Sequence, residues 1–269
     1  MAFVKITAII ICAGYLLVCM AMYAFQRQLQ YFPSQRNPAP QAVGLSGVSA
    51  VQVTTPDGET LTAWHSPAPP RRPTVLFFHG NAGEIADRAD QFAFWQAQRM
   101  GVLFVSPRGY AGSTGSVSEA GLITDAVAAH DWLTAQGGAA TDIILIGESL
   151  GTGLAVQLAA LRPVGAVLLE APYSATVDVA ARLYPWLPVR LLMKDQFRSI
   201  DHIARINAPL LIQHGTDDRV IPFALGQRLF DAATDPKTFV PLPGQGHDAL
   251  YTPALWQTEA LFIANLIAR

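Results

Sequence analysis

Charged residues are scarce in this chain of 269 residues: they make up 14% of the sequence, against about 25% in an average soluble domain. The 18 Lys and Arg residues nearly balance 20 Asp and Glu residues, which gives a formal net charge of -2. Because no basic excess is present that would hold a polyanion, nucleic acid is excluded as a partner. A hydrophobic content of 51% also excludes disorder, so we expect one sizeable core.

Cysteine is almost absent. The two cysteines, Cys12 and Cys19, both fall in the apolar N-terminal run. The rest of the chain therefore has no thiol for a disulfide or for a cysteine-based metal site. We expect a function that needs no metal and no cofactor.

The N-terminal run predicts a membrane helix. From Ile6 to Phe25 no charged residue occurs, and about twenty residues at about 1.5 Å each span a hydrocarbon core of about 30 Å. The run ends on bulky residues, which argues against a cleaved signal peptide. Lys5 and the terminal amine on one side nearly balance Arg27 and Arg36 on the other, so the side of the membrane that the body occupies stays open.

The composition divides the chain into three parts. Residues 1–26 are expected to form the transmembrane anchor, and residues 27–47, rich in Gln, Pro, Asn and Ser, a tether. Residues 48–269 are expected to form the folded body, with an aromatic and proline-rich insertion at 173–207 that predicts a small helical cap.

The body shows alternating strand and helix patterns. Strands are predicted at 50–55, 61–66, 74–79, 102–106, 143–147, 166–170, 210–214 and 238–241, and helices at 83–99, 119–136, 150–161, 223–233 and 250–267. Several strands are continuously apolar, which is typical of a parallel sheet covered by helices on both faces. The pattern therefore predicts an α/β fold with a mostly parallel eight-stranded sheet. The first two strands, joined by the turn at 56–58, are expected to form an antiparallel hairpin at one edge.

One motif suggests a nucleophile. Gly147-Glu148-Ser149-Leu150-Gly151 stands directly between a predicted strand and a predicted helix. Such a tight turn strains the serine backbone and lifts its hydroxyl clear of the strand. The alternative is that Ser149 is an ordinary turn residue or a helix N-cap.

A serine needs a base, and the base needs an acid to orient it. His247 follows the last predicted strand and is the expected base, while Asp218 follows the strand before it and is the expected acid. Glu170, at the end of an earlier strand, is the other candidate acid. Asp217 is expected to point elsewhere and cap the next helix. The chain order Ser, Asp, His is the order found in α/β-hydrolases.

The reaction also needs donors for an oxyanion. The glycine-rich stretch at 79–83 follows a predicted strand, and its Asn81 backbone N–H could join that of Leu150 in an oxyanion hole. The alternative is a glycine-rich turn that leads into a helix. No phosphate-loop pattern is present in the sequence.

Together these motifs resemble the single-pass, membrane-anchored serine hydrolases of the abhydrolase-domain type, over most of the chain. The motifs that carry the resemblance are LQYFP at 29–33, HGNAG at 79–83, RGYAGSTG at 108–115 with Ser118-Glu119, GESLG at 147–151 and EAPY at 170–173. The resemblance implies the α/β-hydrolase fold, a triad of Ser149, Asp218 and His247, and an oxyanion loop at Asn81.

The chain departs from this family at Pro107, where relatives usually have Tyr. The departure leaves the triad intact and puts in doubt the role of Arg108, for which we expect an ion pair with Asp125 across a loop.

The expected activity is hydrolysis of carboxylic esters or thioesters through an acyl-enzyme intermediate at Ser149. The substrates expected are small molecules, lipids or other acyl compounds, and possible ones include acylated proteins. Two alternatives stay open. One is a peptidase, for which the cap offers Asp178, Arg182, Lys194 and Asp195 to grip a peptide terminus; the other is a catalytically silent membrane scaffold. The sequence leaves the oligomeric state open.

Overall fold

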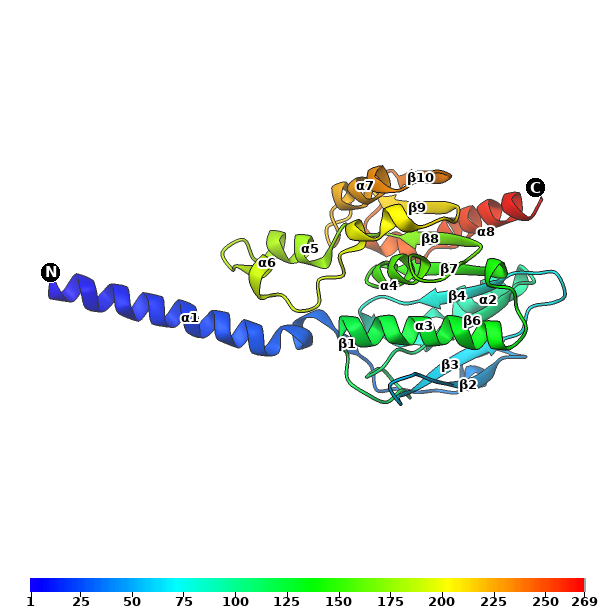
Figure 1. The fold of residues 1–269 in the computed structure, drawn as a ribbon, viewed down its shortest axis with the longest axis horizontal. Coiled ribbons are helices and arrows are strands. Elements are labelled where there is room, and N and C mark those ends of the chain that lie inside the picture. The colour runs from blue at the N-terminus through cyan, green and yellow to red at the C-terminus, as the bar shows by residue number, and fades with distance from the viewer. Residues whose placement is uncertain (269) are drawn as a thin grey trace.

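One mixed sheet runs through the body of the protein (Figure 1). The computed structural model describes residues 1–268. The strands of the sheet are β2 (Ser49–Thr54), β3 (Thr60–Ser66), β4 (Thr74–Phe78), β6 (Gly101–Val105), β7 (Ile143–Glu148), β8 (Ala166–Glu170), β9 (Leu210–Gly215) and β10 (Lys237–Leu242). Their order across the sheet is β10-β9-β8-β7-β4-β6-β3-β2. All eight predicted strands are present.

The pairing of the strands agrees with the sequence pattern. β2 pairs antiparallel with β3, and β3 pairs antiparallel with β6. The remaining neighbours pair in parallel. Every residue of β6, β7, β8 and β9 is buried, whereas the edge strands β2 and β10 are partly exposed. The prediction of a mostly parallel sheet with an antiparallel hairpin at one edge is confirmed.

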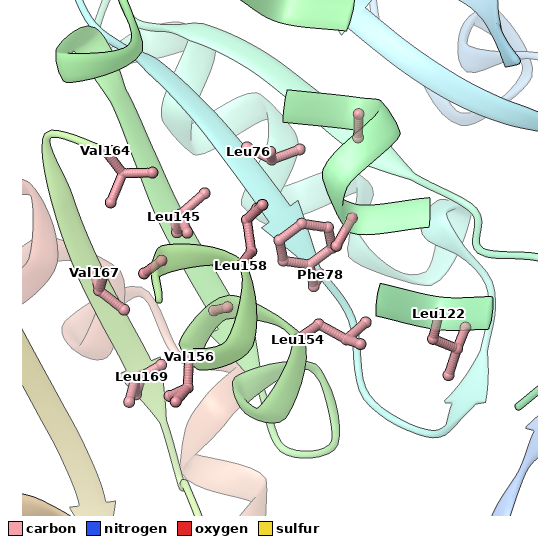
Figure 2. Packing of buried hydrophobic residues seen from close by; sticks show 14 of the residues in the cluster. Leu76, Phe78, Leu122, Leu145, Leu154, Val156, Leu158, Val164, Val167 and Leu169 are labelled. Carbon is pink, nitrogen blue, oxygen red and sulfur yellow. The ribbon is translucent and has the colours of Figure 1, made fainter. Parts of the chain in front are cut away.

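Helices cover both faces of the sheet. They are α2 (Ala89–Ala97), α3 (Glu119–Ala135), α4 (Gly151–Ala159), α7 (Phe223–Ala232) and α8 (Pro253–Ile267). Apolar side chains of α3, α4 and α7 pack on one face, and those of α2 and α8 on the other. Figure 2 shows Leu154 and Leu158 of α4 among Phe78 of β4 and Leu145 of β7.

The helix expected over 83–99 is shorter than predicted. Ala82 and Gly83 form a short strand, β5, and residues 85–88 form a 3₁₀ turn, so that the regular helix begins only at Ala89. Gly83 has a φ of 82°, a left-handed conformation that suits glycine and does not continue a helix. Asp87 accepts a hydrogen bond from the backbone of Glu84 and closes this turn.

The N-terminal helix α1 (Ala2–Gln30) is longer than the expected anchor and extends away from the body (Figure 1). Among the described residues it is the helix that is long and apolar enough to cross a membrane. The segment expected as a tether packs against the body: β1 (Phe32–Pro33) pairs with β5, and Tyr31 is buried. Irregular segments can be packed in this way without any periodic pattern in the sequence.

The cap is helical, as predicted. It contains α5 (Thr176–Leu183), α6 (Val189–Leu192) and two 3₁₀ turns at 199–201 and 203–205. α5 and α6 lie beside the C-terminal half of α1 (Figure 1). Arg27 of α1 donates two hydrogen bonds to the buried carboxylate of Asp195 in the cap segment, one of them over 2.7 Å.

Candidate active site

Ser149 lies in a strained turn between β7 and α4. Its φ is 51°, in the left-handed region that few residues other than glycine adopt. Two glycines allow the close packing around it: a Cβ at Gly147 would come within 2.7 Å of the Gly151 carbonyl oxygen, and a Cβ at Gly151 within 2.1 Å of the Phe78 carbonyl oxygen. The GESLG motif therefore forms the sharp turn that the sequence predicts.

Three distant side chains meet at this turn. His247 Nε2 lies 3.1 Å from Ser149 Oγ, and His247 Nδ1 lies 2.7 Å from Asp218 Oδ2. Ser149 is 9% exposed and Asp218 7% exposed. The hydroxyl, imidazole and carboxylate thus form one hydrogen-bonded series, in which a proton on the hydroxyl can move to the ring.

The backbone around Asp218 holds this carboxylate in place. Its Oδ1 accepts hydrogen bonds of 2.8 Å from the N–H groups of Val220 and Ile221. Burial opposes ionisation, but hydrogen bonds from His214 and His247 hold the pKa of Asp218 well below its ordinary value. The carboxylate is therefore charged at neutral pH.

The neighbouring Asp217 does not cap a helix, contrary to our expectation. Its carboxylate accepts a hydrogen bond from the Thr216 hydroxyl, and α7 has no side-chain cap. The helix begins after Pro222, five residues further along the chain, beyond the two or three residues that a capping side chain reaches. The other candidate acid, Glu170, is buried beside Glu259 and accepts a hydrogen bond from Gln91.

The expected oxyanion donors, the N–H groups of Asn81 and Leu150, belong to residues that line the same cavity as Ser149. Within the described residues, neither N–H donates a backbone hydrogen bond. The Asn81 carbonyl accepts hydrogen bonds from Phe32 N–H over 2.8 Å and from the Tyr110 hydroxyl over 2.7 Å. These contacts hold the loop that contains Asn81 in position, and they do not involve the N–H of Asn81.

A buried ion pair behind this loop was not foreseen in the sequence. Arg88 donates hydrogen bonds of 2.6 and 3.0 Å to the carboxylate of Glu148, which also accepts one from the Gly80 N–H. Burial alone would raise the pKa of Glu148, but the guanidinium holds it below its ordinary value. The charged residue inside the GESLG motif is the one signal that could have suggested a buried partner.

Two histidines beside the site, His79 and His214, form hydrogen bonds that shape the surrounding loops. His79 Nδ1 lies 2.7 Å from the Gly80 carbonyl oxygen, and burial, with the nearby Arg88 charge, lowers the pKa of His79 to about 4. His214 Nε2 donates to the Ile221 carbonyl over 2.9 Å and lies 3.5 Å from the Asp218 carboxylate. His214 thus also supports the acid, a role that its spacing of four residues from Asp218 could have indicated.

Arg108 forms the ion pair expected from its place in the sequence. Its Nε lies 2.8 Å from Asp125, and its two terminal nitrogens contact Asp57 in the β2–β3 turn. Arg108, in the loop after β6, therefore joins the β2–β3 turn to α3. Pro107 does not disturb this pairing.

A cavity of about 450 Å³ opens over Ser149, within the range of about 300–1,000 Å³ that is usual for small-molecule sites. Most of its lining is apolar and comes from the cap and from α1, including Val179, Leu187 and Leu29. Within residues 1–268 no group of three or more metal-ligating side chains is present.

Curated relatives include proteins of bacteria, plants and vertebrates. An uncharacterized protein of Mycobacterium tuberculosis, Rv2307c, is 40% identical over 235 residues, which cover 86% of this chain and 83% of that protein. The α/β-hydrolase domain-containing protein WAV2 of Arabidopsis thaliana is 31% identical, over 90% of this chain and 88% of that protein. The lysophosphatidylserine lipase ABHD12 of Xenopus tropicalis is 31% identical, over 72% of this chain and 58% of that protein.

Solved structures share the fold at low sequence identity. The Pyrococcus furiosus esterase Pf2001 has a TM-score of 0.69 at 17% identity and covers 89% of this chain and 98% of its own. The acetyl xylan esterase of Paenibacillus sp. R4 also has a TM-score of 0.69 at 17% identity, over 90% and 98% of the two chains. No protein-family model matches the chain. The likeness to WAV2 over nearly the whole of both chains shows that this protein belongs to the α/β-hydrolase domain-containing proteins.

Proposed function

We propose that this protein is a serine hydrolase that cleaves carboxylic ester or thioester bonds through an acyl-enzyme intermediate. Ser149 is the nucleophile, His247 the general base and Asp218 the acid that orients it. The observation that carries the proposal is the continuous hydrogen-bonded series, 3.1 Å from Ser149 to His247 and 2.7 Å from His247 to Asp218.

The geometry supports the following sequence of steps. The Ser149 hydroxyl gives its proton to His247 Nε2 as its oxygen attacks the acyl carbon, and the new oxyanion accepts hydrogen bonds from the N–H groups of Asn81 and Leu150. His247 then gives the proton to the leaving alcohol or thiol. A water molecule, activated by the same ring, cleaves the acyl-enzyme and restores the free serine.

The apolar cavity supports acyl substrates. Burying an acyl chain is favourable by about 0.8 kcal/mol for each CH₂ removed from water. Relatives and structural neighbours include a lipase and two esterases. We extend the proposal to lipids, small acyl esters and acylated proteins as substrates, and to attachment to a membrane through α1.

The charged residues of the cap give less support to a peptidase. Asp178 contacts Arg190 at 2.7 Å and Asp195 contacts Arg27 at 2.7 Å, while the Lys194 ammonium lies 4.1 Å from the centre of the Tyr23 ring. These charges already have partners in the fold. A silent scaffold gains no support either, because Ser149 stays in its strained conformation next to an imidazole.

A fluorophosphonate probe tests the proposal on the full-length protein. We expect rapid labelling of the wild type, none of Ser149→Ala, and normal labelling of the control Ser116→Ala, which changes an exposed serine in a loop. Equal labelling of the wild type and Ser149→Ala would overturn the assignment. Absence of both labelling and ester hydrolysis in folded wild-type protein would instead favour the scaffold.

A further inference from the structure

The apolar N-terminal helix α1 is built into the candidate active site. The Asn81 side-chain amide donates a hydrogen bond of 2.9 Å to the Gln30 carbonyl at the end of α1. Phe32, two residues later, donates its N–H to the Asn81 carbonyl over 2.8 Å. The loop that carries a proposed oxyanion donor is therefore attached directly to α1.

The same helix forms a wall of the cavity above Ser149. Met22, Gln26 and Leu29 of α1 line it together with apolar side chains of the cap. Met22 is half-buried, although most of α1 is exposed. A substrate in this cavity would touch the last two turns of a helix whose preceding turns are apolar enough to lie in a bilayer.

The cap reaches well along the apolar run of α1. The Tyr15 hydroxyl donates a hydrogen bond of 3.0 Å to the Trp186 carbonyl in the loop between α5 and α6. Tyr15 precedes Phe25, the end of the apolar run, by ten residues, which corresponds to about 15 Å of helix, or half of a hydrocarbon core of about 30 Å. If α1 spans a membrane, the tip of the cap lies inside one leaflet.

The side chains of the cap match this placement. Leu183, Trp186 and Leu191 are 61%, 56% and 83% exposed, and contiguous exposed apolar side chains usually mark a binding surface. Arg190, the charged residue within 183–192, pairs with Asp178 at 2.7 Å. The other charged partners gather further along, where α1 leaves the apolar run: Arg27 binds Asp195, and the Lys194 ammonium lies over the Tyr23 ring. The apolar side chains at the tip of the cap would match the acyl-chain region of one lipid leaflet, and the charged residues nearer the body would match its headgroup layer.

We propose that the tip of the cap, residues 183–192, inserts into the leaflet beside α1, and that long acyl chains pass from the bilayer to Ser149 through the cavity between α1 and the cap. This inference rests on the proposed function and names the source of its substrate. A chain that follows this route never crosses bulk water, and the side chains of α1 help to determine which chain lengths fit.

Chain-length selectivity tests the route. Full-length protein in phosphatidylcholine nanodiscs is assayed with p-nitrophenyl palmitate and p-nitrophenyl butyrate, and the ratio of their kcat/KM values is compared. We expect Met22→Trp, which fills the cavity, to lower the long-to-short ratio by at least roughly tenfold. The matched control Met20→Trp, at a position that is 61% exposed and outside the cavity, should leave the ratio unchanged. The same ratio in Met22→Trp and wild type would overturn the route.

Fluorescence quenching tests the insertion of the cap. Phosphatidylcholine brominated on its acyl chains should quench part of the tryptophan emission of the wild-type protein. Trp186→Phe should remove that quenched part, and Trp132→Phe, which changes a partly exposed tryptophan on α3, should keep it. Equal quenching of wild type and Trp186→Phe would show that the tip of the cap stays outside the leaflet.

The two proposals fail in different ways. If Ser149→Ala is labelled like the wild type, the proposed chemistry is wrong. If labelling and short-ester hydrolysis both depend on Ser149 while Met22→Trp leaves the chain-length ratio unchanged, the chemistry stands and the membrane route is wrong.

Discussion

At the scale of single residues, Ser149 combines an unfavourable backbone conformation with a chemically useful position. Its φ of 51° is that of a left-handed turn, and the same turn directs its hydroxyl to His247 Nε2. A strained conformation persists when the surrounding structure stabilises it. Here Gly147 and Gly151, which have no Cβ, let the neighbouring backbone pack closely around the turn.

The strain predicts a difference between two inactive variants. A left-handed conformation costs a residue with a Cβ about 1–2 kcal/mol, which exceeds the entropic cost of glycine, about 0.5–1 kcal/mol. We therefore expect Ser149→Gly to unfold at a higher temperature than Ser149→Ala. Thermal unfolding of both proteins in the same detergent gives the comparison, and a lower Tm for Ser149→Gly would contradict it.

Asp218 and its neighbour offer a matched pair for testing the role of the acid. Asp218→Asn removes the charge that orients His247 and should lower kcat for an activated ester by about 10⁴-fold, as the same change does in a serine protease with this triad. Asp217→Asn changes an exposed carboxylate that contacts Thr216 and should leave kcat unchanged. Similar losses in both variants would refute the assignment.

At the scale of elements, the oxyanion loop and the turn after β7 are joined by the buried pair of Arg88 and Glu148. Glu148 accepts a hydrogen bond from Gly80 N–H over 3.1 Å, and a Cβ at Gly80 would come within 2.8 Å of this carboxylate. The pair thus holds the loop after β4 against the turn that carries Ser149.

Breaking this pair should cost much more than breaking an exposed one. Arg88→Met leaves the Glu148 carboxylate buried without its partner, and we expect a loss of about 3–5 kcal/mol in the free energy of unfolding. Arg198→Met removes a guanidinium that is 50% exposed and pairs with Asp201, which is itself 49% exposed; this change should cost about 0–1 kcal/mol. Chemical denaturation of both variants measures the difference. Equal losses in the free energy of unfolding would show that the buried pair stabilises the protein no more than an exposed pair does.

At the scale of the whole molecule, a pair of buried carboxyls links α8 to the centre of the sheet. Glu170 and Glu259 are both fully buried. Burial, together with the charge of Glu259, raises the pKa of Glu170 well above its ordinary value, and burial raises the pKa of Glu259 to about 8. Among the described residues, one oxygen of Glu170 and both oxygens of Glu259 are buried without a hydrogen-bond partner, which disfavours the charged form of these carboxyls.

This pair predicts a pH dependence of stability. A carboxyl that titrates near 8 in the folded protein and at its ordinary value of 4.5 in the unfolded chain favours folding below 4.5. That advantage is lost as the pH rises towards 8, by up to about 1.4 kcal/mol per pH unit for one proton.

The expected result is a Tm that falls between pH 5 and 8 in the wild type and falls less steeply in Glu259→Gln, where the neutral amide cannot ionise. Asp142→Asn is the control and should follow the wild-type slope, because Asp142 is exposed in the turn before β7, whereas Glu170 pairs with the last residue of that strand. Parallel slopes in all three proteins would remove the carboxyl pair as the cause.

The sequence predicted most of the fold and the residues of the site. Strand patterns and the order Ser, Asp, His depend on local signals: apolar runs for β6 to β9, and glycine next to Ser149 and His247. Two predictions differ from the structure. Asp217 does not cap α7 because that helix begins only after Pro222, and the helix expected from 83 begins later because of a contact with another segment. β1 pairs with β5, so that α2 begins only after β5, and no local sequence pattern predicts such a pairing.

By itself, therefore, the sequence determined the helices and strands of the fold, the apolar N-terminal helix and the chemical groups of the site, because each depends on residues that are neighbours in the chain. Only the tertiary structure decided which buried charges share a partner, as Arg88 and Glu148 do, and that α1 and the cap together enclose the cavity over Ser149. The physical reason is that these contacts join irregular segments far apart in the chain. Which residues pair in these segments depends on packing and on the free-energy cost of burying an unpaired charge. Neither factor produces a periodic pattern in the sequence.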